Sequence, residues 1–401
     1  MTIEPVGGGV TAAAGFTAAG VACGIKRSGL DLALLVSEQP ASAAGVFTTN
    51  LAVAAPVVVS REHLSRSGGI ATAVVVNSGC ANACTGDAGM SAARSMADRT
   101  ARAVGCPVEQ VLVASTGVIG ALLDATKVAN GIAAATQTLR RDGHADAARA
   151  IMTTDPSPKE HALRATMPGG VFHVGGMVKG SGMIEPNLAT MLGFVTTDTR
   201  IAPALLQRAL ADACTVTFNA ITVDGETSTN DTVVALASGT SGVEIDERSY
   251  PHFVDVLTAV CRELAIAIVR GGEGATKLMV VRTVGARSPD EARRAAKAIA
   301  NSPLVKTAFH GGDPNWGRLV AVAGRAGVGF NLSKTRVRIG PVVLFEGNKV
   351  FPERERQAAE HLRGQDVEVE VDLGAGGNHA ATVWTCDFSA EYVRINADYR
   401  T

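Results

Sequence analysis

Aromatic residues are scarce in this chain of 401 residues, and neither sign of charge is in excess. Aromatic side chains make up 4% of the sequence, so the core must be built mainly from Ala, Val, Leu and Ile. Lys plus Arg number 37 and Asp plus Glu number 38, without a basic stripe interleaved with aromatic residues. This composition gives no support for nucleic-acid binding. With 46% hydrophobic residues and 44 glycines, it is typical of a globular enzyme with many tight backbone turns.

Secretion signals and long apolar runs are also lacking. The N-terminal segment carries Glu4 and has no basic region followed by an apolar stretch, which argues against a signal peptide and favours a cytoplasmic protein. The longest uncharged stretch, residues 39–60, is interrupted by Pro40, by the polar run 48–50 and by Pro56. It therefore predicts strand, turn and strand rather than a membrane span.

Metal-binding and histidine-based patterns are missing as well. The seven cysteines are dispersed, only Cys80 and Cys84 are close together, and no second Cys or His pair lies at the spacing of zinc ligands. We expect reduced thiols of a cytosolic protein and no bound metal. The eight histidines are scattered, and none stands near both a nucleophile and an acid, so a catalytic triad that uses histidine has little support.

Strand and helix patterns alternate along the chain. Apolar runs rich in β-branched residues predict strands at 32–36, 71–76, 110–114, 192–196, 232–237, 277–284 and 367–373. Apolar residues at helical spacing predict helices at 90–104, 201–213, 250–269 and 289–301. The last helix has Ser288 as a capping residue and Glu291 at the capping-box position. The mixture predicts an α/β or α+β protein in which helices cover sheets, but the strand order does not follow from it.

A glycine-rich segment in the middle of the chain leads directly into a threonine, Thr190, which follows Ala189 and opens an apolar strand. A Thr hydroxyl next to a small residue, in a chain distorted by Gly and Pro, can attack the preceding carbonyl, and hydrolysis then leaves Thr190 as a new N-terminus. Its α-amine, with a pKa of about 7.7–8.0, can act as the general base for its own hydroxyl. The alternative is that Thr190 simply begins a strand, and the spacing alone favours this second interpretation.

Ten short motifs carry more information than the spacing. They are residues 44–50 (AGVFTTN), 77–86 (NSGCANACTG), 115–120 (STGVIG), 151–155 (IMTTD), 179–184 (KGSGMI), 188–192 (LATML), 224–231 (DGETSTND), 272–277 (GEGATK), 313–318 (DPNWGR) and 392–401 (YVRINADYRT). In this order, and over essentially the whole chain, they resemble the ornithine acetyltransferases, also called glutamate N-acetyltransferases, of the cyclic arginine pathway. Cys80, where that family often has Asn, is a small departure.

The resemblance implies a fold and a processing event. The expected fold is a four-layer α-β-β-α sandwich of the ornithine acetyltransferase and aminopeptidase type. The backbone would be cut autocatalytically between Ala189 and Thr190. Residues 1–189 would then form the α chain and residues 190–401 the β chain of one intertwined catalytic unit, assembled as an α2β2 heterotetramer.

The resemblance also implies roles for individual residues. Thr190 would be the nucleophile, and the Thr116 hydroxyl and the Gly117 N–H would stabilise the oxyanion of each tetrahedral intermediate. The residues expected to bind substrate are Thr153, Lys179, Thr190, Glu273, Asn396 and Thr401. Lys179 has the sign that a carboxylate needs, and Glu273 the sign that an ammonium needs. The alternatives are a strand-to-helix turn at 116–117 and solvated surface charges at Lys179 and Glu273.

The expected reaction is acetyl transfer from N2-acetyl-L-ornithine to L-glutamate through an acetyl ester on Thr190, with ping-pong kinetics. The resemblance implies no metal or organic cofactor. Some family members also take acetyl from acetyl-CoA, and whether this chain does so stays open. Two other functions remain as alternatives: an aminopeptidase or amidase of the same fold, in which water is the acceptor, and a binding protein whose chain stays intact.

Overall fold

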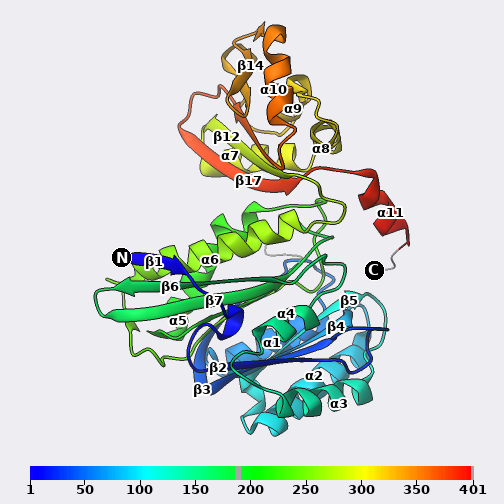
Figure 1. Ribbon diagram of the computed structural model, residues 1–401, viewed down its shortest axis with the longest axis vertical. Helices are drawn as coiled ribbons and strands as arrows, with labels where there is room; N and C mark the ends of the chain where they lie inside the picture. The colour runs from blue at the N-terminus through cyan, green and yellow to red at the C-terminus, as the bar shows by residue number, and fades with distance from the viewer. Residues whose placement is uncertain (186–190, 399–401) are drawn as a thin grey trace. The chain divides into compact units, whose positions relative to one another are not determined.

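A computed structural model describes residues 1–185 and 191–398, which form two compact units. Of the described residues, the first unit contains those within 1–219 and 226–268, and the second contains 220–225 and 269–398 (Figure 1). The predicted cleavage residues Ala189 and Thr190, and the predicted binding residue Thr401, lie outside the described residues.

The first unit is organised around a nine-stranded mixed sheet in its described residues. Its strands run in the order β1 (Thr2–Pro5), β6 (Lys159–Met167), β7 (Gly170–Lys179), β8 (Leu192–Thr197), β10 (Thr232–Ala237), β3 (Leu32–Phe47), β4 (Ile70–Cys80) and β5 (Val111–Val118), and β2 (Phe16–Val21) pairs with β3. Two short strands, β9 (Arg200–Ile201) and β11 (Glu244–Ile245), pair separately.

The long strand β3 divides this sheet into two parts. Its first half pairs with β2 and β4, and its second half pairs with β10. The pairing of β3 with β4 shifts register between Val36 and Ala41, around Pro40, which has no N–H to donate to a ladder. The irregular region separates a β2-β3-β4-β5 part from a part that contains β1, β6, β7, β8 and β10.

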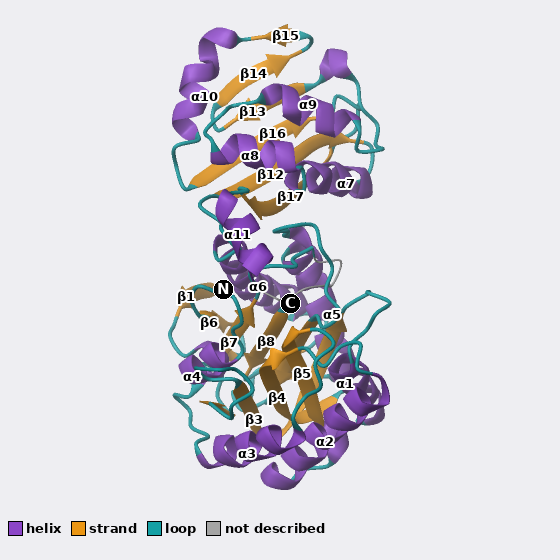
Figure 2. Ribbon diagram, turned by 90° about the vertical axis from the view of Figure 1, so that its right-hand side faces the viewer, coloured by secondary structure: helices purple, strands orange, loops and turns teal. Residues whose placement is uncertain are grey.

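The two parts of the sheet bury their facing sides against each other. Leu35 and Val76 of the first part share a buried cluster with Phe194 and Leu236 of the second. Alternate residues of the β2-β3-β4-β5 part point to the opposite face of the sheet, where they pack against α2 (Gly86–Val104) and α3 (Ala125–Gln137). On the second part, Phe172 of β7 contacts a ring on α6 (Tyr250–Arg270), that of Phe253, with 6.2 Å between the ring centroids. The predicted four-layer α-β-β-α sandwich is confirmed (Figures 1 and 2).

The described residues of the first unit also form the α-helices α1 (Ala55–Arg66), α4 (His144–Ala150) and α5 (Pro203–Val216). Within the described part of the chain, no helix combines the length and apolar character that a membrane crossing requires.

The second unit is a six-stranded sheet with helices packed on one face. The strand order is β15 (Lys349–Val350), β14 (Val342–Glu346), β13 (Arg336–Ile339), β16 (Asp366–Asp372), β12 (Leu278–Ala286) and β17 (His379–Cys386). The helices that share its apolar core are α7 (Pro289–Ala300), α8 (Pro303–His310), α9 (Trp316–Gly324) and α10 (Glu355–His361). A last helix, α11 (Ala390–Asp398), follows β17 (Figure 2).

The predicted elements compare well with the structure. The seven predicted strands correspond to β3, β4, β5, β8, β10, β12 and β16, and the four predicted helices to α2, α5, α6 and α7. The Ser288 hydroxyl accepts the N–H of Glu291 at 3.2 Å, so the predicted cap of α7 is confirmed.

The expected second strand within residues 39–60 is wrong, because helix α1 begins at Ala55. Pro56 stands in the first turn, where its missing N–H costs nothing, and buried Val59, Ser60 and His63 occur at helical spacing. The β-branched valines hid this pattern, and packing against the sheet overrides their preference.

Candidate active site

The predicted oxyanion residues stand near the end of β5, where β5 runs parallel to β4. Thr116 pairs with Ser78, and Gly117 pairs with Gly79. Gly117 has a φ of +129°, and a Cβ at this position would lie 2.6 Å from the backbone nitrogen of Cys80. Only glycine fits such a conformation and such a close approach, so the backbone of the predicted oxyanion pair is defined by its packing.

The predicted carboxylate anchor contacts this pair. Lys179, at the end of β7, is 8% exposed, and its Nζ donates to the Thr116 hydroxyl oxygen at 3.3 Å. Because that oxygen accepts from an ammonium group, its own hydrogen is left to donate elsewhere. Lys179 also pairs with Leu192 of β8, two residues after Thr190. The structure therefore brings Thr116, Lys179 and the chain directly after Thr190 to the same place.

Asp155 connects two of the predicted binding segments. Its carboxylate accepts the N–H of Gly180 at 2.7 Å, the N–H of Thr153 at 3.1 Å and the Lys159 ammonium at 2.6 Å. Burial alone would raise the pKa of this carboxyl, but the charges of Lys179 and Lys159, with the hydrogen bonds, hold it at about 2. Asp155 thus fixes Thr153 beside the segment that follows Lys179. The sequence motif 151–155 contained this residue, but nothing in its spacing indicated its role.

Replacing Asp155 with alanine is expected to destabilise the fold strongly. Lys159 is only 4% exposed, so the variant would leave a buried ammonium group without its carboxylate. Loss of one partner of a buried pair costs about 3–5 kcal/mol. Urea unfolding of the two proteins measures this difference, and a loss below about 1 kcal/mol would contradict it.

The double variant Asp155→Leu with Lys159→Met is the matched control, because it removes both charges and should recover most of the loss.

The stability that Asp155 contributes should depend on pH in one direction. Its pKa is depressed in the folded state, so the contribution is complete above the ordinary carboxyl pKa of 3.8 and is lost as the pH falls towards about 2.

A second buried carboxyl lies beside the residue after Thr190. Burial raises the pKa of Asp231 well above its ordinary value, although the N–H of Met191 and the Thr48 hydroxyl favour the charged form. Its Oδ2 has no hydrogen-bond partner among residues 1–185 and 191–398. The neighbouring Asn230 donates to the Ser115 carbonyl at 2.9 Å and to the Ala81 carbonyl at 2.6 Å. The 224–231 motif is thus tied to β5, the strand that carries Thr116, and to the end of β4.

The predicted ammonium anchor lies in the second unit. Glu273 is buried, and its carboxylate accepts from the Asn396 side-chain amide at 2.7 Å. The loop that carries Glu273 is held by Asp387, which accepts the backbone N–H groups of Thr276 and Lys277 and contacts the His310 ring at 2.7 Å. Two residues that were predicted separately to bind substrate, Glu273 and Asn396, are therefore in direct contact.

The predicted residues form two groups in the described chain. Thr116, Gly117, Thr153 and Lys179 belong to the first unit, and Glu273 and Asn396 belong to the second. Sequence reasoning did not identify Asp155, Asn230 or Asp231, which surround the first group.

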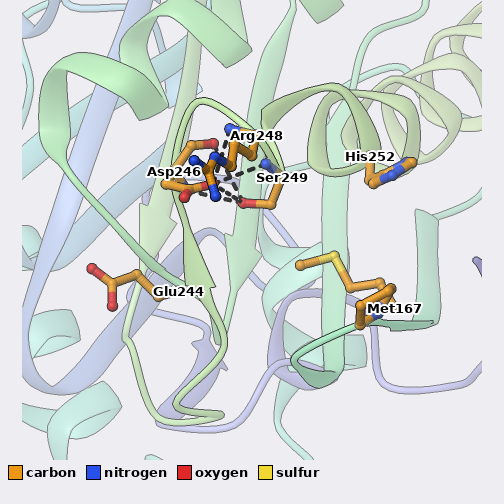
Figure 3. A pocket seen from close by; sticks show the side chains of 7 residues that line it. Met167, Glu244, Asp246, Arg248, Ser249 and His252 are labelled. Atoms are coloured by element: carbon orange, nitrogen blue, oxygen red, sulfur yellow. Dashed lines mark hydrogen bonds between the residues drawn. The ribbon is translucent and has the colours of Figure 1, made fainter.

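The first unit also has a surface pocket whose lining residues differ from the predicted site residues. It is lined by Met167, Pro168, Glu244, Asp246, Arg248, Ser249 and His252, and holds none of the predicted residues (Figure 3). The Asp246 carboxylate accepts the N–H groups of Arg248 and Ser249 directly before α6, so its charge is used in a helix cap.

Comparison with known proteins identifies the family. Residues 17–401 match the model of the ArgJ family. The chain is 47% identical to the arginine biosynthesis bifunctional protein ArgJ of Chlorobaculum tepidum, with 100% of this chain and 99% of the relative covered. It is 48% identical to the protein of the same name from Symbiobacterium thermophilum, with 100% of both covered.

Two solved structures are also similar. The crystal structure of the arginine biosynthesis bifunctional protein argJ from Bacillus halodurans is 42% identical, with a TM-score of 0.51, and covers 52% of this chain and 100% of its own. An ornithine acetyltransferase from Mycobacterium tuberculosis, complexed with ornithine, is 44% identical, with a TM-score of 0.44, and covers 46% of this chain and 99% of its own.

The fold and the matches over the whole chain define an enzyme of the acyltransferase class. The chain belongs to the ArgJ family, and the predicted relationship is confirmed.

Proposed function

We propose that the protein cuts its own backbone between Ala189 and Thr190 and then transfers acetyl from N2-acetyl-L-ornithine to L-glutamate through an ester on Thr190. The observation that carries this proposal is the contact between buried Lys179 and the Thr116 hydroxyl, next to the strand that begins two residues after Thr190. A cation for a substrate carboxylate and a donor for an oxyanion thus stand side by side.

The cut requires one attack and one hydrolysis. The Thr190 hydroxyl oxygen attacks the Ala189 carbonyl carbon, the C–N bond breaks, and the nitrogen takes a proton to become the α-amine of Thr190. Water then hydrolyses the ester and leaves the Ala189 carboxylate. The result is a nucleophile and a base in one residue, which is the arrangement of N-terminal threonine enzymes.

Acetyl transfer uses the Thr190 hydroxyl and α-amine in both of its half-reactions. The Thr190 hydroxyl attacks the acetyl carbonyl of the donor while its amine takes the proton, and the amine of ornithine leaves with that proton. The amine of glutamate then attacks the acetyl ester and restores the hydroxyl. Each tetrahedral oxyanion is stabilised by the Thr116 hydroxyl and the Gly117 N–H, so no metal or organic cofactor is needed.

The charges suit amino-acid substrates. Lys179 binds the α-carboxylate, and Thr153 supplies a neutral hydrogen-bonding group beside it, since Asp155 holds both segments. Glu273, with Asn396 against it, binds the side-chain ammonium of ornithine, and Thr401 adds a further polar group. Residues 1–189 and 190–401 stay together as a cytoplasmic α2β2 heterotetramer. The name bifunctional, borne by the curated relatives, favours acetyl-CoA as a second donor to Thr190.

Glutamate is expected to accelerate the consumption of N2-acetyl-L-ornithine, because its amine competes with water for the acetyl ester. Ornithine release, followed with and without glutamate, tests this. An aminopeptidase or amidase of the same fold would release ornithine at a rate that does not depend on glutamate, and that result would remove the transferase assignment.

A further inference from the structure

Lys26 lies in the first unit, in the connection from β2 to β3, and reaches a segment far away in the chain. Its Nζ donates to the carbonyl of Met152 at 3.0 Å, directly before Thr153. The fully buried Asp31 holds this connection in place. Its carboxylate accepts the backbone N–H groups of Lys26 at 3.0 Å and of Cys23 at 2.7 Å. The position of Lys26 is therefore defined by the fold rather than by a chance surface contact.

The aliphatic part of Lys26 crosses the strand next to the oxyanion pair. A Cβ at Gly79 would lie 2.8 Å from Cγ of Lys26, so the two residues are in close contact. Gly79 is also the β-ladder partner of Gly117. Lys26 thus lies against the strand beside Gly117 and ends at the segment that carries Thr153.

Three ammonium groups, those of Lys26, Lys159 and Lys179, stand against two carboxylates, those of Asp31 and Asp155. Lys159 is paired with Asp155 at 2.6 Å, and the Asp31 carboxylate accepts from two backbone N–H groups, which leave its charge in place. Among the described residues, the ammonium groups of Lys26 and Lys179 have only neutral oxygens as hydrogen-bond partners, those of Met152 and Thr116. Burial, together with the nearby charge of Lys179, lowers the pKa of Lys26, although Asp31 and Asp155 oppose the shift. A bound anion would relieve this imbalance.

We propose that Lys26 is a second carboxylate anchor, which binds the side-chain carboxylate of L-glutamate after ornithine has left. The inference rests on the proposed acetyl transfer and adds how the enzyme recognises its acceptor. Glutamate has two carboxylates, and the site offers two cations without an acidic partner in contact. Ornithine has one carboxylate, so the first half of the reaction uses Lys179 and does not use Lys26. Lys26 then supplies a charge that the side-chain carboxylate of glutamate needs and that the side-chain ammonium of ornithine does not.

Lys26→Met should raise the KM for glutamate by about 10–100-fold, which corresponds to the loss of one hydrogen bond between charged groups. The KM for N2-acetyl-L-ornithine should change little. L-Glutamine is the matched acceptor, because it has the same shape without the side-chain charge. The preference of the wild type for glutamate over glutamine should fall by the same factor in the variant.

Lys26→Arg keeps the positive charge and should retain most of the preference, while Arg27→Met removes a neighbouring exposed cation and should behave as wild type. If Lys26→Met raises the KM values for glutamate and glutamine equally, or impairs ornithine release before glutamate is added, Lys26 is not an acceptor anchor. If glutamate has no effect on the wild type, the proposed transfer itself fails, and this outcome is distinct from the first.

Discussion

Replacing Thr190 with alanine is expected to abolish acetyl transfer and to leave the chain uncut. Both reactions begin with an attack by the Thr190 hydroxyl, so removal of one oxygen removes both. Loss of the nucleophile in comparable acyl-transfer enzymes lowers kcat by about 10⁶-fold. The rate of ornithine release with glutamate present measures the effect. Normal turnover in Thr190→Ala would refute the mechanism.

Thr190→Ser is the matched control for this variant. Serine keeps the hydroxyl that attacks and, after the cut, the α-amine that accepts its proton. We therefore expect Thr190→Ser to be cut and to transfer acetyl, with rates between those of the wild type and Thr190→Ala. Inactivity of both variants would point to a role of Thr190 in the fold rather than in the chemistry.

Replacing Thr116 with valine is expected to lower kcat by about 10²–10³-fold, the effect of removing one oxyanion donor. Valine has the shape of threonine and lacks only the hydroxyl group. The Lys179 ammonium donates to the Thr116 oxygen at 3.3 Å, which leaves the hydroxyl hydrogen for the oxyanion. The N–H of Gly117 remains, so activity should fall without disappearing.

Thr116→Ser keeps the donor and should retain most of the activity. Because the proposed role concerns the transition state, the kcat of Thr116→Val should fall more than the KM for either substrate rises. An unchanged kcat in Thr116→Val would exclude Thr116 as an oxyanion donor.

Most strands could be predicted from the sequence because their residues carry a local signal. The β-branched runs of β4 and β10 are buried on both faces and stand out from an Ala- and Gly-rich background. Helix α1 could not be predicted in this way, because Val57 and Val59 favour strands and the helix depends on packing against the sheet.

The site residues also differ in whether a local sequence signal indicates them. Thr116 and Lys179 occur in motifs that resemble a known family, so the sequence alone indicates their roles. Asp155 and Lys26 gain their importance from contacts that link distant segments: Lys26 reaches Met152, 126 positions away, and Asp155 joins the 151–155 and 179–184 motifs. No local pattern indicates such pairs, since long-range contacts arise only when the sheet is assembled.

The intact mass of the purified wild-type protein tests most directly whether the backbone is cut between Ala189 and Thr190. We expect two fragments, one of which begins at Thr190, and no species near the full 41.1 kDa. Thr190→Ala, measured beside it, should give a single species near 41.1 kDa. A wild-type protein of that full mass, with no fragment that begins at Thr190, would contradict self-cleavage and the nucleophile that it creates.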